Sequence, residues 1–190
     1  FEIISGGCGG TVIACINSSA ASYGETAFRN DFNPGQVYYI RVFNVSAGLS
    51  TSAFAICVQK YPSPLNDACA NATELTPGPT CVNKVGTFSG AMYNGDATCA
   101  TTTSQDAWYK FTATATSMSI QLGAVTGLNH GFQVYEGSCS GTIITCKNTN
   151  PTGSSESQTL STLVVGQIYF IKVFVATAGL SVSNFNICLI

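Results

Sequence analysis

Apolar and polar residues alternate along much of this chain, with the period of a β-strand. Segments 106–113, 117–122 and 184–190 each show this alternation, so each predicts a strand with one buried face. Segment 167–175 is apolar on both faces except at Lys172, which predicts a central strand covered on both sides. Gly, Asn and Ser clusters separate these segments, and no stretch of a dozen residues has helical spacing. The pattern predicts an all-β, antiparallel, jelly-roll-like β-sandwich.

The beginning of the chain repeats its end. A shift of 131 residues aligns FEIISGGCGGTVIAC, which begins at Phe1, with FQVYEGSCSGTIITC, which begins at Phe132. The same shift aligns PGQVYYIRVF with VGQIYFIKVF, and AGLSTSAFAIC with AGLSVSNFNIC. Self-similarity at a fixed spacing is the signature of tandem repeats. We therefore predict that 63–190 is a complete β-sandwich repeat and that 1–62 is the C-terminal half of another.

The shorter unit is incomplete in this comparison, because it matches only the second half of the longer one. About sixty residues of half a sandwich cannot bury their apolar face alone. We expect the N-terminal half of that repeat to come from elsewhere in a longer polypeptide or from a neighbouring subunit of a filament.

Composition narrows the class of protein. Charged residues make up 8% of the chain, against about 25% in an average soluble domain. The net charge of −2 provides no basic field for nucleic acid. No apolar run approaches the roughly 18 residues that cross a bilayer, so we expect no membrane insertion. A single His and few carboxylates offer little for acid–base catalysis. We expect a protein that is not an enzyme and has no cofactor and no metal.

Nine cysteines without a Cys-x-x-Cys pair favour disulfides over a metal site, and therefore an extracellular setting. Cys8 and Cys15 recur as Cys139 and Cys146, and each pair flanks a short segment of hairpin type. The spacing predicts a local bridge within each pair.

The remaining cysteines allow several pairings. We favour Cys69–Cys188, which would tie the first strand to the last, and Cys81–Cys99, which would close the loop before the 106–113 strand. Cys57 is the repeat equivalent of Cys188 and would then have no partner in this chain. A Cys57–Cys69 bridge across the linker is the alternative.

A family resemblance is carried by the segments LNDACANATEL, DAWYKFTATAT, FQVYEGSC, STLVVGQIYFIKV and FNIC. They resemble repeats in secreted surface proteins of gliding bacteria of the Bacteroidota. They are also similar to the bacterial pre-peptidase C-terminal domain, which has Asp-x-Trp-Tyr-x-Phe and Gly-x-x-Tyr-Tyr-Ile-x-Val strands. The resemblance covers 64–190, and 1–62 as the second half. It implies a β-sandwich, export to the cell surface and use as a stalk or adhesive module, with no shared catalytic residue.

Few residues are candidates for ligand chemistry. Trp108 and Tyr109 are weak candidates for ligand contact, since exposed aromatic rings can stack on sugars, although alternation turns one of the two inward. His130 lies in a turn-like segment and is expected at the surface. The carboxylates of Asp67, Asp96 and Asp106 could hold calcium together with loop carbonyls. Glycoside cleavage would need two carboxylates facing a cleft, for which Asp96, Asp106 and Glu136 are the available set.

These observations predict a structural or adhesive repeat module of a large secreted, cell-surface or filament-forming bacterial protein. The alternative is a carbohydrate- or protein-binding accessory module of a secreted hydrolase or peptidase. The expected partners are neighbouring repeats or neighbouring filament subunits, with surface glycans as further partners.

Overall fold

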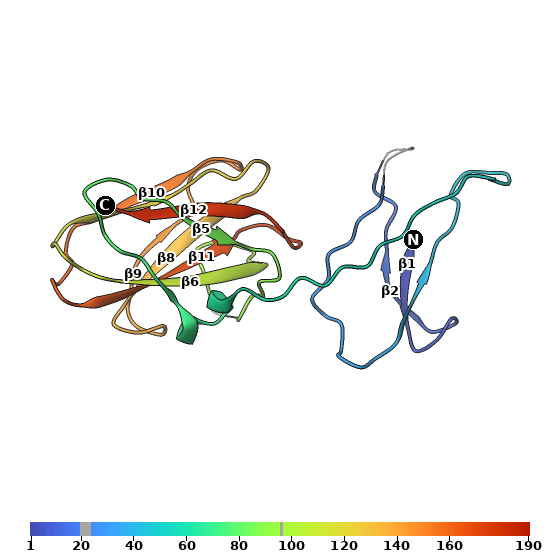
Figure 1. The fold of residues 1–190 in the computed structure, drawn as a ribbon, viewed down its shortest axis with the longest axis horizontal. Helices are drawn as coiled ribbons and strands as arrows, with labels where there is room; N and C mark the ends of the chain where they lie inside the picture. Colours follow the sequence, from blue (N-terminus) through green and yellow to red (C-terminus); the bar gives the residue numbers. More distant parts are fainter. Residues whose placement is uncertain (20–23, 96) are drawn as a thin grey trace. The chain divides into compact units, whose positions relative to one another are not determined.

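The structure is a computed structural model that describes residues 1–19, 24–95 and 97–190 (Figure 1). The chain forms two compact units, Phe1–Gln59 and Lys60–Ile190. Both are built from β-strands, and the helical elements of the described residues are the short 3₁₀ turns η1 (Leu65–Asp67) and η2 (Cys69–Asn71). None of these could cross a membrane.

The second unit is a sandwich of two sheets (Figure 1). The five-stranded sheet contains, in spatial order, β4 (Thr73–Glu74), β6 (Gln105–Thr112), β11 (Ile168–Val175), β8 (His130–Glu136) and β9 (Ile143–Lys147). The four-stranded sheet contains β10 (Glu156–Leu160), β7 (Met118–Leu122), β12 (Asn184–Leu189) and β5 (Lys84–Thr87). All neighbours are antiparallel except β4 and β6, which are parallel. The predicted β-sandwich is confirmed, with one parallel pair at an edge.

The core lies between the two sheets and follows the alternation seen in the sequence. β7 turns Met118, Ile120 and Leu122 inward and leaves the residues between them more exposed. β11 is the middle strand of the five-stranded sheet and is buried on both faces over most of its length, as its apolar pattern predicts. On the outer face of this sheet, Trp108 packs against Tyr135.

The first unit contains one sheet, ordered β2 (Thr11–Cys15), β1 (Glu2–Ser5) and β3 (Tyr38–Arg41). Its register is that of β9, β8 and β11 shifted by 131 residues. Ile3 lies opposite Ile40 in the first unit, and Val134 lies opposite Ile171 in the second. The register irregularity that follows Ile3 in β1 also follows Val134 in β8. The sequence repeat therefore extends to strand pairing.

A turn held by a glutamate carboxylate occurs in both units, at positions 131 residues apart. Glu25 accepts hydrogen bonds from the backbone N–H groups of 18–19, at 3.1 and 2.9 Å. Glu156 accepts them from the backbone N–H groups of 149–150, at 2.7 and 2.6 Å. Because hydrogen bonds stabilise the charged form, those in the first unit lower the pKa of Glu25.

The cysteines of the second unit are all in disulfides, but not in the predicted pairs. The bonds are Cys69–Cys139, Cys81–Cys188 and Cys99–Cys146. The predicted bridges Cys139–Cys146, Cys81–Cys99 and Cys69–Cys188 are therefore wrong. Each observed bond joins the half of the sandwich formed by 64–131 to the half formed by 132–190.

Strand geometry explains why the hairpin bridge does not form. Cys146 is in β9 and lies opposite Gln133 of β8, whereas Cys139 lies in the turn after β8. Ile143 is the first residue of β9 that pairs with β8, and Cys146 lies three residues further along the strand, a distance of about 10 Å. Disulfides need Cα atoms within about 7 Å. The same geometry holds for Cys8 and Cys15, which are free and exposed in the described part of the chain, so the prediction of a bridge between them is also wrong.

The predicted Cys69–Cys188 bond fails for another reason. Cys188 alternates with the inward-facing Ile187 and Leu189, so it points to the outer side of the four-stranded sheet. Cys69 packs beside Trp108 on the outer side of the five-stranded sheet. The two cysteines lie on opposite sides of the sandwich and cannot meet.

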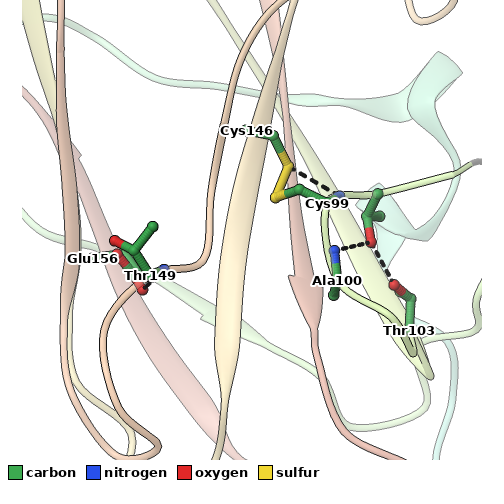
Figure 2. The surroundings of a disulfide bond; sticks show 7 residues. Cys99, Ala100, Thr103, Cys146, Thr149 and Glu156 are labelled. Atoms are coloured by element: carbon green, nitrogen blue, oxygen red, sulfur yellow. Dashed lines mark hydrogen bonds between the residues drawn. A yellow bond between two sulfur atoms is a disulfide. The ribbon is translucent and has the colours of Figure 1, made fainter.

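The Cys99–Cys146 bond anchors a loop to β9 (Figure 2). The backbone N–H of Cys99 donates to the Cys146 sulfur at 3.2 Å, and the hydroxyls of Thr98 and Thr103 lie 2.7 Å apart within the loop. The disulfide thus fixes the loop that precedes β6. β6 in turn pairs with β11, the middle strand of the five-stranded sheet.

Candidate functional site

A groove of about 320 Å³ opens at the edge of the sandwich. It is lined by Asn66, Thr73, Lys84, Val85, Gly86, Thr87, Tyr109 and Asn184. These residues come from η1, from β4 and β6 of one sheet, and from β5 and β12 of the other. The groove therefore lies where the two sheets meet, and a ligand there would contact both.

Gly86 shapes the floor of this groove. A Cβ atom at this position would overlap the hydroxyl of Tyr109 and the ring of Phe185. The rings of Tyr109 and Phe185 meet edge to face with centroids 6.1 Å apart. Gly86 is needed because the two aromatic side chains approach its backbone closely, and of these two Tyr109 also lines the groove.

Asn66 and Tyr109 supply the buried polar groups of the groove. The side-chain amide of Asn66 donates to the backbone oxygen of Trp108 at 2.9 Å, which holds η1 against β6. Burial raises the pKa of Tyr109 to about 12, although a hydrogen bond with Asn66 opposes the shift. The Tyr109 hydroxyl is therefore protonated at neutral pH and can donate a hydrogen bond.

The groove is equipped for polar recognition. Amides, hydroxyls and the Lys84 ammonium provide donors and acceptors, and Val85 adds an apolar contact. Its lining contains no carboxylate, so these residues do not supply the acid pair that glycoside cleavage requires.

A second polar cluster is buried on the outer face of the five-stranded sheet. The Lys172 ammonium lies 3.5 Å from a carboxylate oxygen of Asp106, and both side chains are 0% exposed. The ammonium also lies 5.3 Å from the Tyr93 ring centroid and 5.4 Å from that of Trp108. The other Asp106 oxygen accepts a hydrogen bond from the Asn94 amide at 3.3 Å. Burial raises the pKa of Asp106, and the Lys172 charge opposes that shift.

A family model described as galactose binding domain-like, and named as T9SS-associated, matches residues 65–187. The chain belongs to this family. The match confirms the resemblance to domains of secreted Bacteroidota surface proteins, and it implies a secreted or cell-surface protein. Galactose-binding-like domains are non-catalytic accessory domains.

Among solved structures, seven chains match. One is the pre-peptidase C-terminal domain of a collagenase from Bacillus anthracis, determined at 1.0 Å. It is 10% identical, with a TM-score of 0.44, and the match covers 70% of this chain and 100% of that one. No curated protein matches this chain.

The two aromatic residues singled out from the sequence do not form a sugar-stacking surface in this galactose-binding-like domain. Trp108 and Tyr109 are both buried, on opposite faces of β6. Tyr109 still reaches the groove, but through its hydroxyl, since its ring packs in the core. The groove itself was not predicted, because its lining comes from four strands and a turn that are distant in sequence.

The possible calcium ligands are only partly brought together. Asp67 accepts a hydrogen bond from the Met92 N–H at 2.7 Å, and its backbone oxygen accepts one from the Asn94 amide, which also contacts Asp106. Partial burial raises the pKa of Asp67. Asp96 lies outside the described residues. Among the residues that the structure describes, no three His, Cys, Asp or Glu side chains converge on a site for a metal ion.

The remaining candidates are placed apart from the groove. His130 is buried at the start of β8, and its ring nitrogens lie 2.8 Å from the oxygen of Gly123 and 3.4 Å from that of Leu128, so the prediction of a surface residue is wrong. Asp106 and Glu136 lie opposite residues of β11 that are five positions apart, or about 17 Å along the strand. These two carboxylates do not face one cleft.

Proposed function

We propose that this chain is a structural and adhesive module of a large secreted cell-surface protein. The observation that carries the proposal is that each of the three disulfides joins the two halves of the sandwich. The bonds close segments with sequence separations of 47, 70 and 107 residues. A load on the second unit therefore cannot separate its halves without breaking covalent bonds.

The interior supports the same role. The core is continuous between the two sheets, and the Asp106–Lys172 pair adds a buried ionic contact between β6 and β11. The low content of charged side chains also leaves few Lys and Arg residues as protease sites. Such a module suits exposure to extracellular proteases and shear.

An adhesion assay tests this proposal. The full chain would be displayed on a non-adherent bacterial host through a fused surface anchor, and cells retained under flow would be counted. The matched control displays the chain with Cys69, Cys81 and Cys99 changed to Ser. We expect the native chain to raise retention and the control to lose the gain. Correctly folded, displayed chain that gives no gain over anchor-only cells would contradict an adhesive role.

A second candidate function is recognition of a polar ligand, such as a glycan, in the groove. The polar lining around Tyr109 favours it, together with membership of the galactose-binding-like family. Titration of the chain with galactose-containing oligosaccharides tests it. We expect Lys84→Ala and Asn184→Ala to weaken binding about tenfold each, the worth of one or two hydrogen bonds. Lys147→Ala, on β9 and outside the groove, is the matched control. Absence of saturable binding by the native chain would exclude this candidate for those sugars.

A further inference from the structure

The first unit exposes apolar side chains at positions whose repeat equivalents are core residues. Phe54 is 71% exposed, whereas its equivalent Phe185 is 3% exposed. Ile56 is 58% exposed, whereas its equivalent Ile187 is fully buried. The sequence of the first unit thus retains an inner face, and none of the described residues of the unit covers these two side chains.

The strands that do form in the first unit are those whose partners it contains. β1, β2 and β3 are equivalent to β8, β9 and β11, which pair with one another in the second unit. Residues 25–29 and 53–58 are equivalent to β10 and β12, yet the structure describes both segments and neither is a strand. In the second unit, β10 pairs with β7, and β12 pairs with β7 and β5. Strand formation therefore stops where the partner belongs to a 64–131 half.

The unpaired cysteines follow the same rule. Cys8, Cys15 and Cys57 are free and exposed among the described residues. Their repeat equivalents Cys139, Cys146 and Cys188 each bond to a cysteine of the 64–131 half. All three free cysteines thus lack a partner from a half equivalent to 64–131.

If a second copy of this chain supplied that segment, another half would lose its own covering half. Residues 1–190 contain one covering half, 64–131, and two halves that need covering, 1–59 and 132–190. The covering half is already bonded to 132–190 by three disulfides. Further copies of residues 1–190 would each leave one half uncovered, so the occupant must be an additional half.

We infer that the first unit docks a further half-module with the strand pattern and cysteine spacing of 64–131. That segment adds strands beside β3 and pairs with 25–29 and 53–58, which become strands. It bonds Cys8 through its equivalent of Cys69, Cys15 through its equivalent of Cys99, and Cys57 through its equivalent of Cys81. The inference is independent of the adhesive role.

The covalent step needs an oxidant of the disulfide class. For each bond, one thiol of the first unit and one of the half-module lose two electrons and two protons in total. One molecule of oxidised glutathione accepts them and leaves as two reduced glutathione molecules. Docking comes first and brings the paired sulfurs within bonding distance.

The test uses the full chain extended by a copy of residues 63–131 fused before Phe1, refolded with a glutathione redox pair. Free thiols are counted after denaturation, and disulfides are mapped by mass spectrometry without reduction. We expect three free thiols in the native chain and none in the extended one. We expect the Cys8, Cys15 and Cys57 peptides to be linked to the fused copy's equivalents of Cys69, Cys99 and Cys81, respectively, while the three bonds of the second unit stay as they are.

A matched control carries Ser at the three cysteines of the fused copy. It should keep three thiols, but alkylation of Cys57 should slow at least about tenfold because docking buries it. Three reactive thiols in both extended proteins, a Cys8–Cys15 bond, or a covalent dimer of the native chain through these cysteines would overturn the inference.

If the extended protein does not fold, the 63–131 segment is added in trans to the native chain. Hydrogen exchange of the 53–58 amides should then slow about tenfold or more, since those residues join a strand. Unchanged exchange at a saturating excess of segment would equally overturn the inference.

Discussion

Replacing Lys172 by Met tests whether the buried ion pair stabilises the sandwich. The substitution keeps a long side chain in place but leaves the Asp106 carboxylate without its nearest positive charge. Both side chains are fully buried, so solvent does not screen their 3.5 Å contact. Loss of one partner of such a pair costs about 3–5 kcal/mol, because the remaining charge is buried and unpaired.

The aromatic rings beside Lys172 and the protonation of Asp106 change the expected loss of stability. The ammonium also faces two aromatic rings, at 5.3 and 5.4 Å, and losing a desolvated cation–π contact adds about 1–2 kcal/mol. Protonation of Asp106 offsets part of the loss, since burial already raises its pKa. We therefore expect Lys172→Met to lower the free energy of unfolding of the second unit by about 3–5 kcal/mol at pH 7.

Urea unfolding with intact disulfides provides the assay. The chain has one tryptophan, and Trp108 lies in the second unit, so its fluorescence follows this unit without a signal from the first. The double variant Lys172→Met with Asp106→Leu should recover most of the loss, because it removes both charges. Lys172→Arg should lose only about 1–2 kcal/mol, since it keeps the charge but must fit a larger group.

Two results would contradict a stabilising role for the Asp106–Lys172 pair. One is a loss below about 1 kcal/mol for Lys172→Met, which would mean that the pair contributes no more than an exposed one. The other is a double variant as unstable as the sum of the two single variants, which would mean that the two charges are not coupled.

Three further predictions follow from the same structure. Gly86→Ala should lower the stability of the second unit by about 1–3 kcal/mol in urea unfolding, because a new Cβ overlaps two packed rings. Gly123→Ala is the control, since its Cβ makes an ordinary 3.4 Å contact, and equal losses would contradict the overlap. The raised pKa of Asp106 means that the folded protein holds this proton to a higher pH than the unfolded chain does. The contribution of Asp106 to the free energy of unfolding should therefore fall as pH rises above about 3.8. Asp106→Asn should flatten the dependence of the free energy of unfolding on pH in this range, and an unchanged slope would be inconsistent with the raised pKa. Changing Cys99 and Cys146 together to Ser should cost about 4 kcal/mol, the chain-entropy value for a separation of 47 residues, as judged by the urea midpoint, and a change below about 1 kcal/mol would contradict it.

The strands and their faces could be predicted from the sequence because a two-residue period is a local property. The inward positions of β7 and the doubly covered β11 follow directly from that period. The charge of Lys172 was visible as the interruption of an apolar strand. Its partner was not predictable, because Asp106 lies on another strand and two positions away in register.

Disulfide pairing could not be predicted because it depends on how the two halves stack. Cys188 lies in a strand of the four-stranded sheet, whereas Cys69 lies in η2 and packs on the five-stranded sheet. Whether the two cysteines meet therefore depends on the stacking of the sheets. The spacing of Cys139 and Cys146 suggested a local bond, but both bond to the other half instead. His130 was misplaced for a similar reason, since neighbouring Gly and Asn residues indicate a turn, while the strand begins at His130 itself.

The most direct test of this account is a disulfide map of the intact, unreduced chain by proteolysis and mass spectrometry. We expect the cross-half bonds Cys69–Cys139, Cys81–Cys188 and Cys99–Cys146, with the remaining three cysteines as thiols. A local Cys139–Cys146 or Cys81–Cys99 bond would contradict it, because the halves of the sandwich would then not be joined as the proposed function requires.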